Sequence, residues 1–201
     1  MDKRLLSELK EAIGHPPASA VDGSRRRVRE WFAQAAPLIQ WDVTDSPLGA
    51  LYVGMSAVGV CSIAFGVDAD SFLSSLDPLA HAERAPGALE PVMRQLRAYF
   101  SGRRARFDLP LDMGRLTPFQ RTVLQTARTI PPGAVWTYAQ VARAIGRPRA
   151  SRAVGQALSR NPIPIVIPCH RVIGSDGGLH GYSAPGGLES KRWPLQFEGA
   201  L

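Results

Sequence analysis

The sequence "NPIPIVIPCHRVIG", residues 161 to 174, places a cysteine directly before a histidine inside a run of apolar residues. Prolines at positions 162, 164 and 168 remove backbone donors and exclude a regular helix, so we expect this segment to be extended and buried. Three interpretations of Cys169 are open: an inert buried residue, a metal ligand or a nucleophile.

A metal site is the weakest of these interpretations. Zinc needs three or four ligands, and the remaining histidines and Cys61 are scattered, without a CxxC pair. A nucleophile needs a base and a group that orients it, which His170 and a carboxylate could supply. Because neighbouring side chains point in different directions, we expect a water to link Cys169 to His170. The thiolate formed in an apolar pocket would be a strong nucleophile.

The composition is that of a globular protein whose 201 residues can form two small domains. Two cysteines are too few for a disulfide scaffold and favour a reduced, cytoplasmic compartment. We expect no membrane association, because no apolar run could cross a bilayer. The first residues, MDKRLLSELKEAIG, do not have the pattern of a secretory leader.

Positive charge gathers in residues 101 to 160, which contain eleven arginines and two acidic residues, Asp108 and Asp112. Such a block favours a polyanionic partner, because each neutralised phosphate releases condensed counterions. A solvated basic surface explains the charge equally well.

Residues 1 to 112 divide into two parts. Residues 1 to 36 form an N-terminal extension of unknown role, with an amphipathic stretch and a basic segment, RRRVREWFAQAA, that could be a helix. Three β-like runs, at 39 to 44, 50 to 56 and 59 to 65, predict an antiparallel meander. The helical period over 88 to 100 predicts a helix, so residues 37 to 112 form an α/β domain.

Two helix starts of one kind open the second domain, residues 113 to 201. Thr117 and Gln120 form a capping box in TPFQ, and Thr137 and Gln140 repeat it in TYAQ. Gly146 ends the second of these helices, and a third is expected over about 149 to 159. The last two helices and their turn have the dimensions of a helix-turn-helix.

The third helix is rich in small residues, with Arg152 and Gln156 as its long polar side chains before Arg160. Small side chains favour close approach to the minor groove, whose hydrogen-bond pattern is degenerate, so DNA would be bound with little sequence preference. Arg152 could enter the base stack in place of an extruded nucleotide. The alternative, which composition alone favours, is a core helix with Arg152 in an ion pair.

Four stretches carry a resemblance to a known family: TPFQRTVL, IPPGAVWTYAQVA, SRAVGQALSRNPIPIVIPCHRVIGSDGGLHGYS and GGLESKRW. Over about residues 40 to 199 the chain resembles the O6-alkylguanine-DNA alkyltransferases. The resemblance implies an α+β fold. A ribonuclease-H-like N-terminal domain, an antiparallel sheet plus a helix, would precede a mostly helical winged-helix or helix-turn-helix DNA-binding domain.

The resemblance also implies catalytic roles at matching positions. Cys169 corresponds to the alkyl acceptor, His170 to the water-linked base and Glu198 to the carboxylate that orients and charges the histidine. Asn161 would brace the active-site turn by hydrogen bonds. Tyr138 would donate a proton or hydrogen bond to guanine N3 as the purine leaves.

The resemblance further implies the residues that bind DNA and surround the base. Arg152 would replace the flipped nucleotide, and the other expected DNA contacts are Ala150, Ser151, Ala153, Gly155 and Arg121. The backbone of Val172 and Ser183 would contact the guanine edge, with Tyr182 and Leu158 as apolar walls. The loop after Tyr182 carries two extra residues compared with the family, Ala184 and Pro185, which bear on the size of the pocket.

The implied function is DNA repair by irreversible transfer of the alkyl group of a flipped O6-alkylguanine, mainly O6-methylguanine, to Cys169. O4-methylthymine is a further candidate substrate. A thioether is not displaced by water, so each molecule would act once, as a monomer on double-stranded DNA and without a cofactor or metal. Two alternatives are a non-catalytic alkyltransferase-like lesion-binding protein, which typically has tryptophan in place of the cysteine, and a helix-turn-helix transcription factor.

Overall fold

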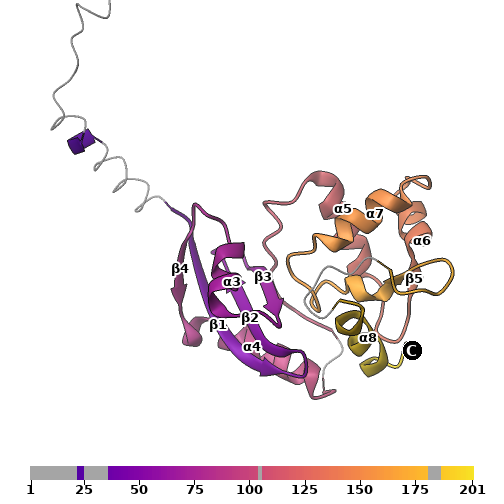
Figure 1. Ribbon diagram of the computed structural model, residues 1–201, viewed down its shortest axis with the longest axis horizontal. Coiled ribbons are helices and arrows are strands. Elements are labelled where there is room, and N and C mark those ends of the chain that lie inside the picture. Colours follow the sequence, from indigo (N-terminus) through magenta and orange to yellow (C-terminus); the bar gives the residue numbers. More distant parts are fainter. Residues whose placement is uncertain (1–21, 25–35, 104–105, 181–186) are drawn as a thin grey trace, which may run out of the picture. The chain divides into compact units, whose positions relative to one another are not determined.

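The computed structural model describes residues 22–24, 36–103, 106–180 and 187–201 (Figure 1). Contacts divide the chain into residues 1–37 and residues 38–201. The expected amphipathic stretch, and the basic segment except for its last residue, lie outside the described residues. The second unit, residues 38–201, contains a sheet followed by a group of helices.

A four-stranded sheet forms the first half of this unit. Strands β1 (Leu38–Ser46), β2 (Gly49–Met55) and β3 (Val60–Phe65) form the expected antiparallel meander. Strand β4 (His81–Arg84) adds to the other side of β1, giving the order β3-β2-β1-β4, and runs parallel to it. The expectation of an antiparallel sheet is therefore wrong at this edge. The sequence HAER lacks the apolar alternation that predicts a strand.

The two faces of the sheet are covered by different helices. Helix α4 (Pro86–Phe100) packs against one face and extends two residues further towards the N-terminus than the periodicity indicated. Helix α3 (Ala69–Ser75), which the sequence did not reveal, buries Phe72 against the other face beside Ile39 and Leu76. The core under α4 contains the apolar stripe of the helix: Leu89, Val92, Met93, Leu96 and Tyr99.

The second half of the unit is mostly helical. It contains α5 (Pro118–Arg128), α6 (Tyr138–Ala144), α7 (Ser151–Ser159) and α8 (Leu188–Phe197). Both predicted capping boxes are present, and Gly146 follows α6 with a positive φ of 71°. Helices α6 and α7 pack together as expected for a helix-turn-helix, although α7 begins at Ser151. Two short parallel strands, β5 (Trp136–Thr137) and β6 (Val172–Ile173), complete this part.

The proline-rich segment before Cys169 is buried, but it is not extended. Ile165 has φ 72°, and the Ile167 amide donates to the Ile163 carbonyl at 2.9 Å, so the chain turns tightly. It then enters a short 3-10 helix, η1 (Cys169–Arg171). Prolines exclude a helix without specifying an extended chain, and here they flank a turn.

One apolar core runs from the sheet into the helical part. A backbone hydrogen bond joins the two, because the Ile63 amide donates to the Pro162 carbonyl at 2.8 Å. The Val60 amide donates to the Pro110 carbonyl at 2.9 Å, which holds the segment after α4 against β3. The sheet therefore contacts the active-site segment directly. No helix in the described part of the chain is long and apolar enough to span a membrane.

The close approach of Gly59 to the segment after α4 gives a stability prediction. A Cβ at Gly59 would overlap the backbone carbonyl of Pro110, so Gly59→Ala should lower the free energy of unfolding by about 1–3 kcal/mol. At Gly87 in α4 a Cβ meets nothing within 4 Å, and Gly87→Ala should leave stability unchanged or raise it slightly. Chemical denaturation of both variants measures the difference, and equal stabilities would contradict the close packing at Gly59.

Candidate active site

Cys169 lies at the first position of η1 and is 6% exposed. Burial raises the pKa of its thiol above the usual value, while a hydrogen bond from Asn161 and the positive charge of Lys191 act in the opposite direction. The thiol is therefore protonated at neutral pH in the protein as it stands. It is surrounded by the groups that would favour its thiolate.

Asn161 closes the turn that presents Cys169. Its Nδ2 donates to the Ile167 carbonyl at 2.8 Å, and its Oδ1 accepts from the Ile163 amide at 3.0 Å. These bonds satisfy backbone groups that the turn leaves without strand or helix partners. The residue thus occupies the bracing position expected of it.

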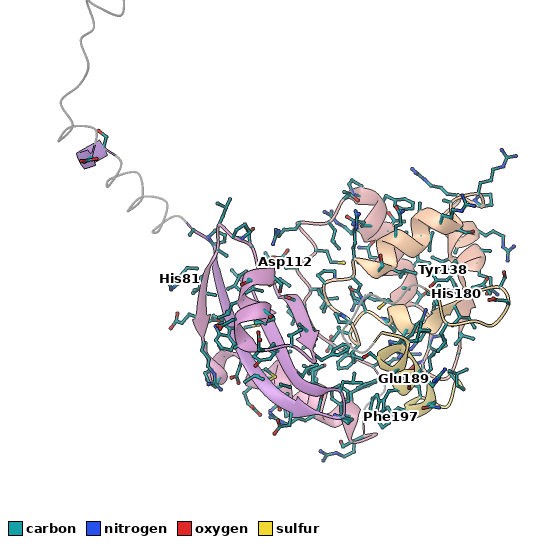
Figure 2. The ribbon with its side chains drawn as sticks, in the orientation of Figure 1. His81, Asp112, Tyr138, His180, Glu189 and Phe197 are labelled. Carbon is teal, nitrogen blue, oxygen red and sulfur yellow. The ribbon has the colours of Figure 1, made fainter. Side chains whose placement is uncertain are left out.

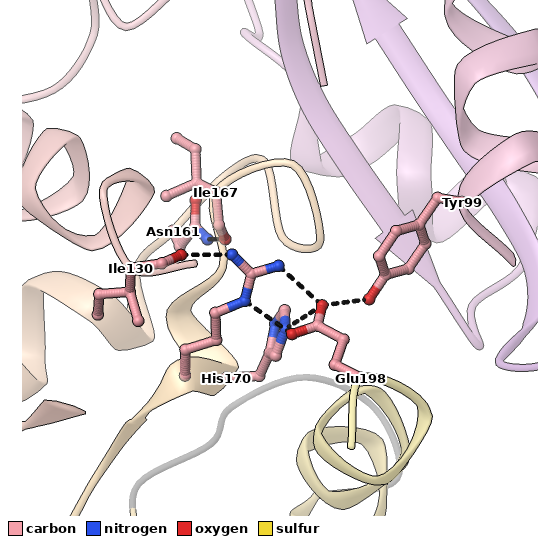
Figure 3. Close-up of polar contacts among 7 residues, drawn as sticks. Tyr99, Ile130, Asn161, Ile167, His170 and Glu198 are labelled. Atoms are coloured by element: carbon pink, nitrogen blue, oxygen red, sulfur yellow. Dashed lines mark hydrogen bonds and ion pairs between the residues drawn. The ribbon is translucent and has the colours of Figure 1, made fainter. Parts of the chain in front are cut away.

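The Glu198 carboxylate, only 3% exposed, is the centre of a buried polar network (Figure 3). Its Oε1 lies 3.1 Å from His170 Nε2 and accepts from the Tyr99 hydroxyl at 2.7 Å. The Arg171 guanidinium forms hydrogen bonds to both oxygens, with Nε donating to Oε2 at 2.7 Å and Nη2 to Oε1 at 2.8 Å. Its Nη1 donates to the Ile130 carbonyl at 2.6 Å. Sequence reasoning found Glu198 and His170, but it missed Arg171 and Tyr99.

This network favours a neutral His170. Burial lowers the pKa of the imidazole; Glu198 raises it, and the cations Arg171 and Lys191 lower it further. Arg171 already pairs with Glu198, so the carboxylate orients the histidine and only partly offsets the lowering of its pKa. A neutral ring with its Nε2 proton towards Glu198 leaves Nδ1 as an acceptor. Within the described residues Nδ1 is buried and has no hydrogen-bond partner.

A second cluster joins Lys191 of α8 to Tyr138 of α6. The Lys191 amine is buried, and it donates to the Val172 carbonyl at 2.7 Å, the His180 carbonyl at 3.1 Å and the Tyr138 hydroxyl at 3.3 Å. Tyr138 in turn donates to the His180 carbonyl at 2.7 Å, and Figure 2 shows these two residues close together. Burial lowers the pKa of Lys191 to about 8. Sequence reasoning did not identify Lys191, which stands among charged neighbours in "GGLESKRW".

A groove of about 710 Å³ opens beside α7. Four expected site residues line it together: Tyr138, Ser151, Arg152 and Gly155. Arg152 is exposed there, which contradicts the alternative of a core ion pair. The groove is also lined by the unexpected residues Asp176 and His180.

The other expected site residues lie elsewhere. Ala153 is exposed on α7, and Ala150 lines a separate hollow with Arg147 and Arg149. Arg121 is half-buried on α5, and its Nη2 reaches the Leu116 carbonyl at 3.4 Å. Val172 and Leu158 are buried in the core. The last expected positions, Tyr182, Ser183, Ala184 and Pro185, lie outside the described residues.

Across the described ranges, no three His, Cys, Asp or Glu side chains gather in a way that could hold a metal ion.

The buried carboxylate predicts an acid-sensitive stability. Burial alone would raise the pKa of Glu198, but hydrogen bonds from His170 and Arg171 lower it to about 2. A carboxylate with a lowered folded-state pKa stabilises the fold above its unfolded pKa, about 4.3, and this contribution is lost as the pH falls towards 2. The free energy of unfolding should fall by roughly 1–3 kcal/mol over that range from Glu198 alone.

Denaturation of the protein and of Glu198→Gln between pH 5 and pH 2 measures this contribution. The variant should be less stable at pH 5, and its stability should depend less on pH. Parallel pH curves would contradict the lowered pKa of Glu198.

Both halves of the unit formed by residues 38–201 are similar to known proteins. Residues 39–113 match the ribonuclease-like domain of 6-O-methylguanine DNA methyltransferase, and residues 118–200 match its DNA binding domain. A methylated-DNA–protein-cysteine methyltransferase of Shigella flexneri is 51% identical over 117 residues, which are 58% of this chain and 65% of the relative. One from Mycobacterium tuberculosis is 48% identical over 162 residues, 80% of this chain and 93% of the relative.

Solved structures agree as well. The crystal structure of Mycobacterium tuberculosis OGT in complex with DNA superposes with a TM-score of 0.70 and 37% identity, and covers 80% of this chain and 93% of that one. The α+β fold class and the family inferred from the sequence are thereby confirmed. The chain belongs to the 6-O-methylguanine DNA methyltransferase family.

Proposed function

We propose that this protein repairs DNA by moving the alkyl group of O6-alkylguanine, mainly O6-methylguanine, onto its own Cys169. The observation that carries the proposal is the buried thiol on a turn braced by Asn161, next to a histidine that Glu198 orients. Family membership supports the same reaction, since relatives along most of the chain are methylated-DNA–protein-cysteine methyltransferases.

Thiol activation follows from the arrangement of His170. Its Nδ1 is the acceptor left by the Glu198 contact, so the Cys169 proton passes through a water to Nδ1. The positive charge of Lys191 then stabilises the thiolate. The thiolate sulfur bonds to the alkyl carbon, the bond from that carbon to O6 breaks, and guanine departs with the electron pair. Tyr138 turns its hydroxyl from the His180 carbonyl to guanine N3 and stabilises the departing base.

DNA binding is assigned to α7. Its exposed face combines Arg152 with the small residues Ser151, Ala153 and Gly155, which suits close backbone approach in the minor groove. Arg152 fills the space of the flipped nucleotide, and binding depends little on sequence. The protein acts as a monomer on chromosomal DNA, which places it at the nucleoid in the cytoplasm.

The product fixes the stoichiometry. Water does not displace a thioether, so each molecule reacts once and no turnover follows. The family resemblance assigns the guanine pocket to Leu158 and Val172, which are buried in the core, and to Tyr182 and Ser183, which lie outside the described residues.

The transfer is tested by mass spectrometry after incubation with a duplex containing O6-methylguanine. The peptide with Cys169 should gain one methyl group in place of one hydrogen, with at most one adduct per molecule. The peptide with Cys61 should stay unmodified, because Cys61 lies on strand β3 of the sheet, away from the DNA-binding helix α7 and from the His170–Glu198 pair. Cys169→Ala should retain DNA binding and lose transfer. An unmodified Cys169 in protein that binds the lesion would support the non-catalytic alternative.

Arg152 is proposed to act as a wedge that fills the space of the flipped nucleotide, and this role predicts a difference between substrates. Arg152→Ala should slow transfer from duplex DNA roughly ten-fold or more, because an unfilled gap in the stack disfavours the flipped base, and should hardly change the reaction with free O6-benzylguanine. Arg160→Ala is the matched control, since Arg160 is exposed one residue after α7 and its replacement removes the same charge. Equal losses on both substrates would contradict the wedge.

A further inference from the structure

We infer that Tyr99 of α4 is a positioning residue for alkyl transfer, because its hydroxyl holds the Glu198 oxygen that contacts His170. The inference rests on the proposed function and adds to it a contribution from the sheet-containing part of the chain. Tyr99 lies within the region that matches the ribonuclease-like domain, and Glu198 within the region that matches the DNA binding domain.

Tyr99 contacts the same oxygen of Glu198 that lies beside His170. Glu198 Oε1 receives the Tyr99 hydroxyl at 2.7 Å and faces His170 Nε2 at 3.1 Å, whereas Oε2 receives Arg171 Nε at 2.7 Å (Figure 3). Arg171 Nη2 also reaches Oε1 at 2.8 Å. The direction and electron density of Oε1 are thus set partly by Tyr99.

Tyr99 differs from the other two donors in where it is anchored. His170 and Arg171 both belong to η1, so they move with the turn that carries Cys169. Tyr99 belongs to α4, a fifteen-residue helix packed on the sheet, and gives Glu198 a contact that is independent of that turn. Glu198 itself caps α8, where its amide bonds to the Pro194 carbonyl at 2.9 Å.

Contacts with other aromatic rings hold the ring of Tyr99 in place, independently of its hydroxyl. It packs against the rings of Phe100, Phe107 and Phe197, with centroid distances of 5.2, 5.3 and 5.6 Å. Phenylalanine would keep these contacts and remove a buried polar atom. The hydroxyl therefore contributes through Glu198 more than through packing, and Tyr99→Phe removes the hydrogen bond to Glu198 while keeping the ring contacts.

The hydroxyl also bears on the protonation of His170. Among the described residues, the charged or titratable groups around the His170 imidazole are Glu198, Arg171, Lys191 and Cys169. Tyr99 withdraws electron density from Oε1 without adding a charge. Without it, Oε1 attracts the Nε2 proton more strongly, and the pKa of His170 rises.

The test compares Tyr99→Phe with Tyr52→Phe, a tyrosine of β2 whose ring stacks on Phe72 on the other face of the sheet. Single-turnover transfer is measured with saturating duplex containing O6-methylguanine, across pH 5 to 9. Tyr99→Phe should react about three- to ten-fold more slowly at neutral pH, the effect of one ordinary lost hydrogen bond, because Arg171 still holds both oxygens of Glu198. Its DNA affinity should be unchanged. The acid limb of its rate profile should move to higher pH. Tyr52→Phe should match the protein without substitutions in its rate at neutral pH and in its pH profile.

Two further measurements separate positioning from stability. In a Glu198→Gln background, Tyr99→Phe should add little further loss of rate, because the hydroxyl acts through the carboxylate. The imidazole nitrogen resonances of His170, recorded by NMR on unreacted protein, should shift in Tyr99→Phe and not in Tyr52→Phe. An additive loss of rate in the double variant would overturn the inference. So would unshifted resonances, or a lowered melting temperature with an unchanged rate and pH profile.

The outcomes also distinguish this inference from the proposed function. If the protein without substitutions transfers no alkyl group, the proposed function fails. The role of Tyr99 as a positioning residue for transfer then fails as well. The NMR comparison would still report whether its hydroxyl governs His170. If the unmodified protein transfers and Tyr99→Phe behaves like Tyr52→Phe, only the inference about Tyr99 fails.

Discussion

The buried carboxylate of Glu198 is the constraint on which the active site depends. An ionised carboxylate removed from water costs several kcal/mol unless charged and hydrogen-bonding partners compensate. Here the compensation comes from Arg171 and His170 on η1 and from Tyr99 on α4, while Glu198 lies at the end of α8. These elements are distant in sequence, so the site is complete only when the turn, the C-terminal helix and α4 are all packed. The fold and the site therefore form together.

The distribution of charge in this network suits a protein that acts once. Arg171 offsets the charge of Glu198, so His170 is held in place but stays neutral and can accept a proton at Nδ1. Burial keeps the Cys169 thiol protonated, and thiols react with oxidants and electrophiles mainly as thiolates. In the proposed function a stray reaction would consume the molecule. In that proposal the thiol is activated only through a water and His170, which protects it against such loss.

The sequence predicted those features that depend on neighbouring residues. Both capping boxes are complete within four residues, and the apolar stripe of α4 follows from a helical period. Residues with remote partners were identified only where the family resemblance indicated them, as for His170 and Glu198, and the others were missed. Tyr99 had the pattern of a core residue, and its ring is one, but its hydroxyl meets a carboxylate 99 positions away. Arg171 and Lys191 had no recognisable partner in sequence, because they bond to backbone carbonyls and to groups brought close only by folding.

The turn before Cys169 illustrates what proline patterns leave open. Three prolines excluded a helix, yet the chain turns and places Ile165, a β-branched residue, at φ 72° in the core. This conformation costs on the order of 1–3 kcal/mol, so neighbouring contacts must hold it. Asn161 supplies two hydrogen bonds to the turn backbone, and the Ile167 amide supplies another to Ile163. These bonds hold the turn that precedes η1. Asn161 therefore contributes to holding both the strained Ile165 and the segment that carries the Cys169 thiol, which supports the role proposed for an asparagine eight residues before the cysteine.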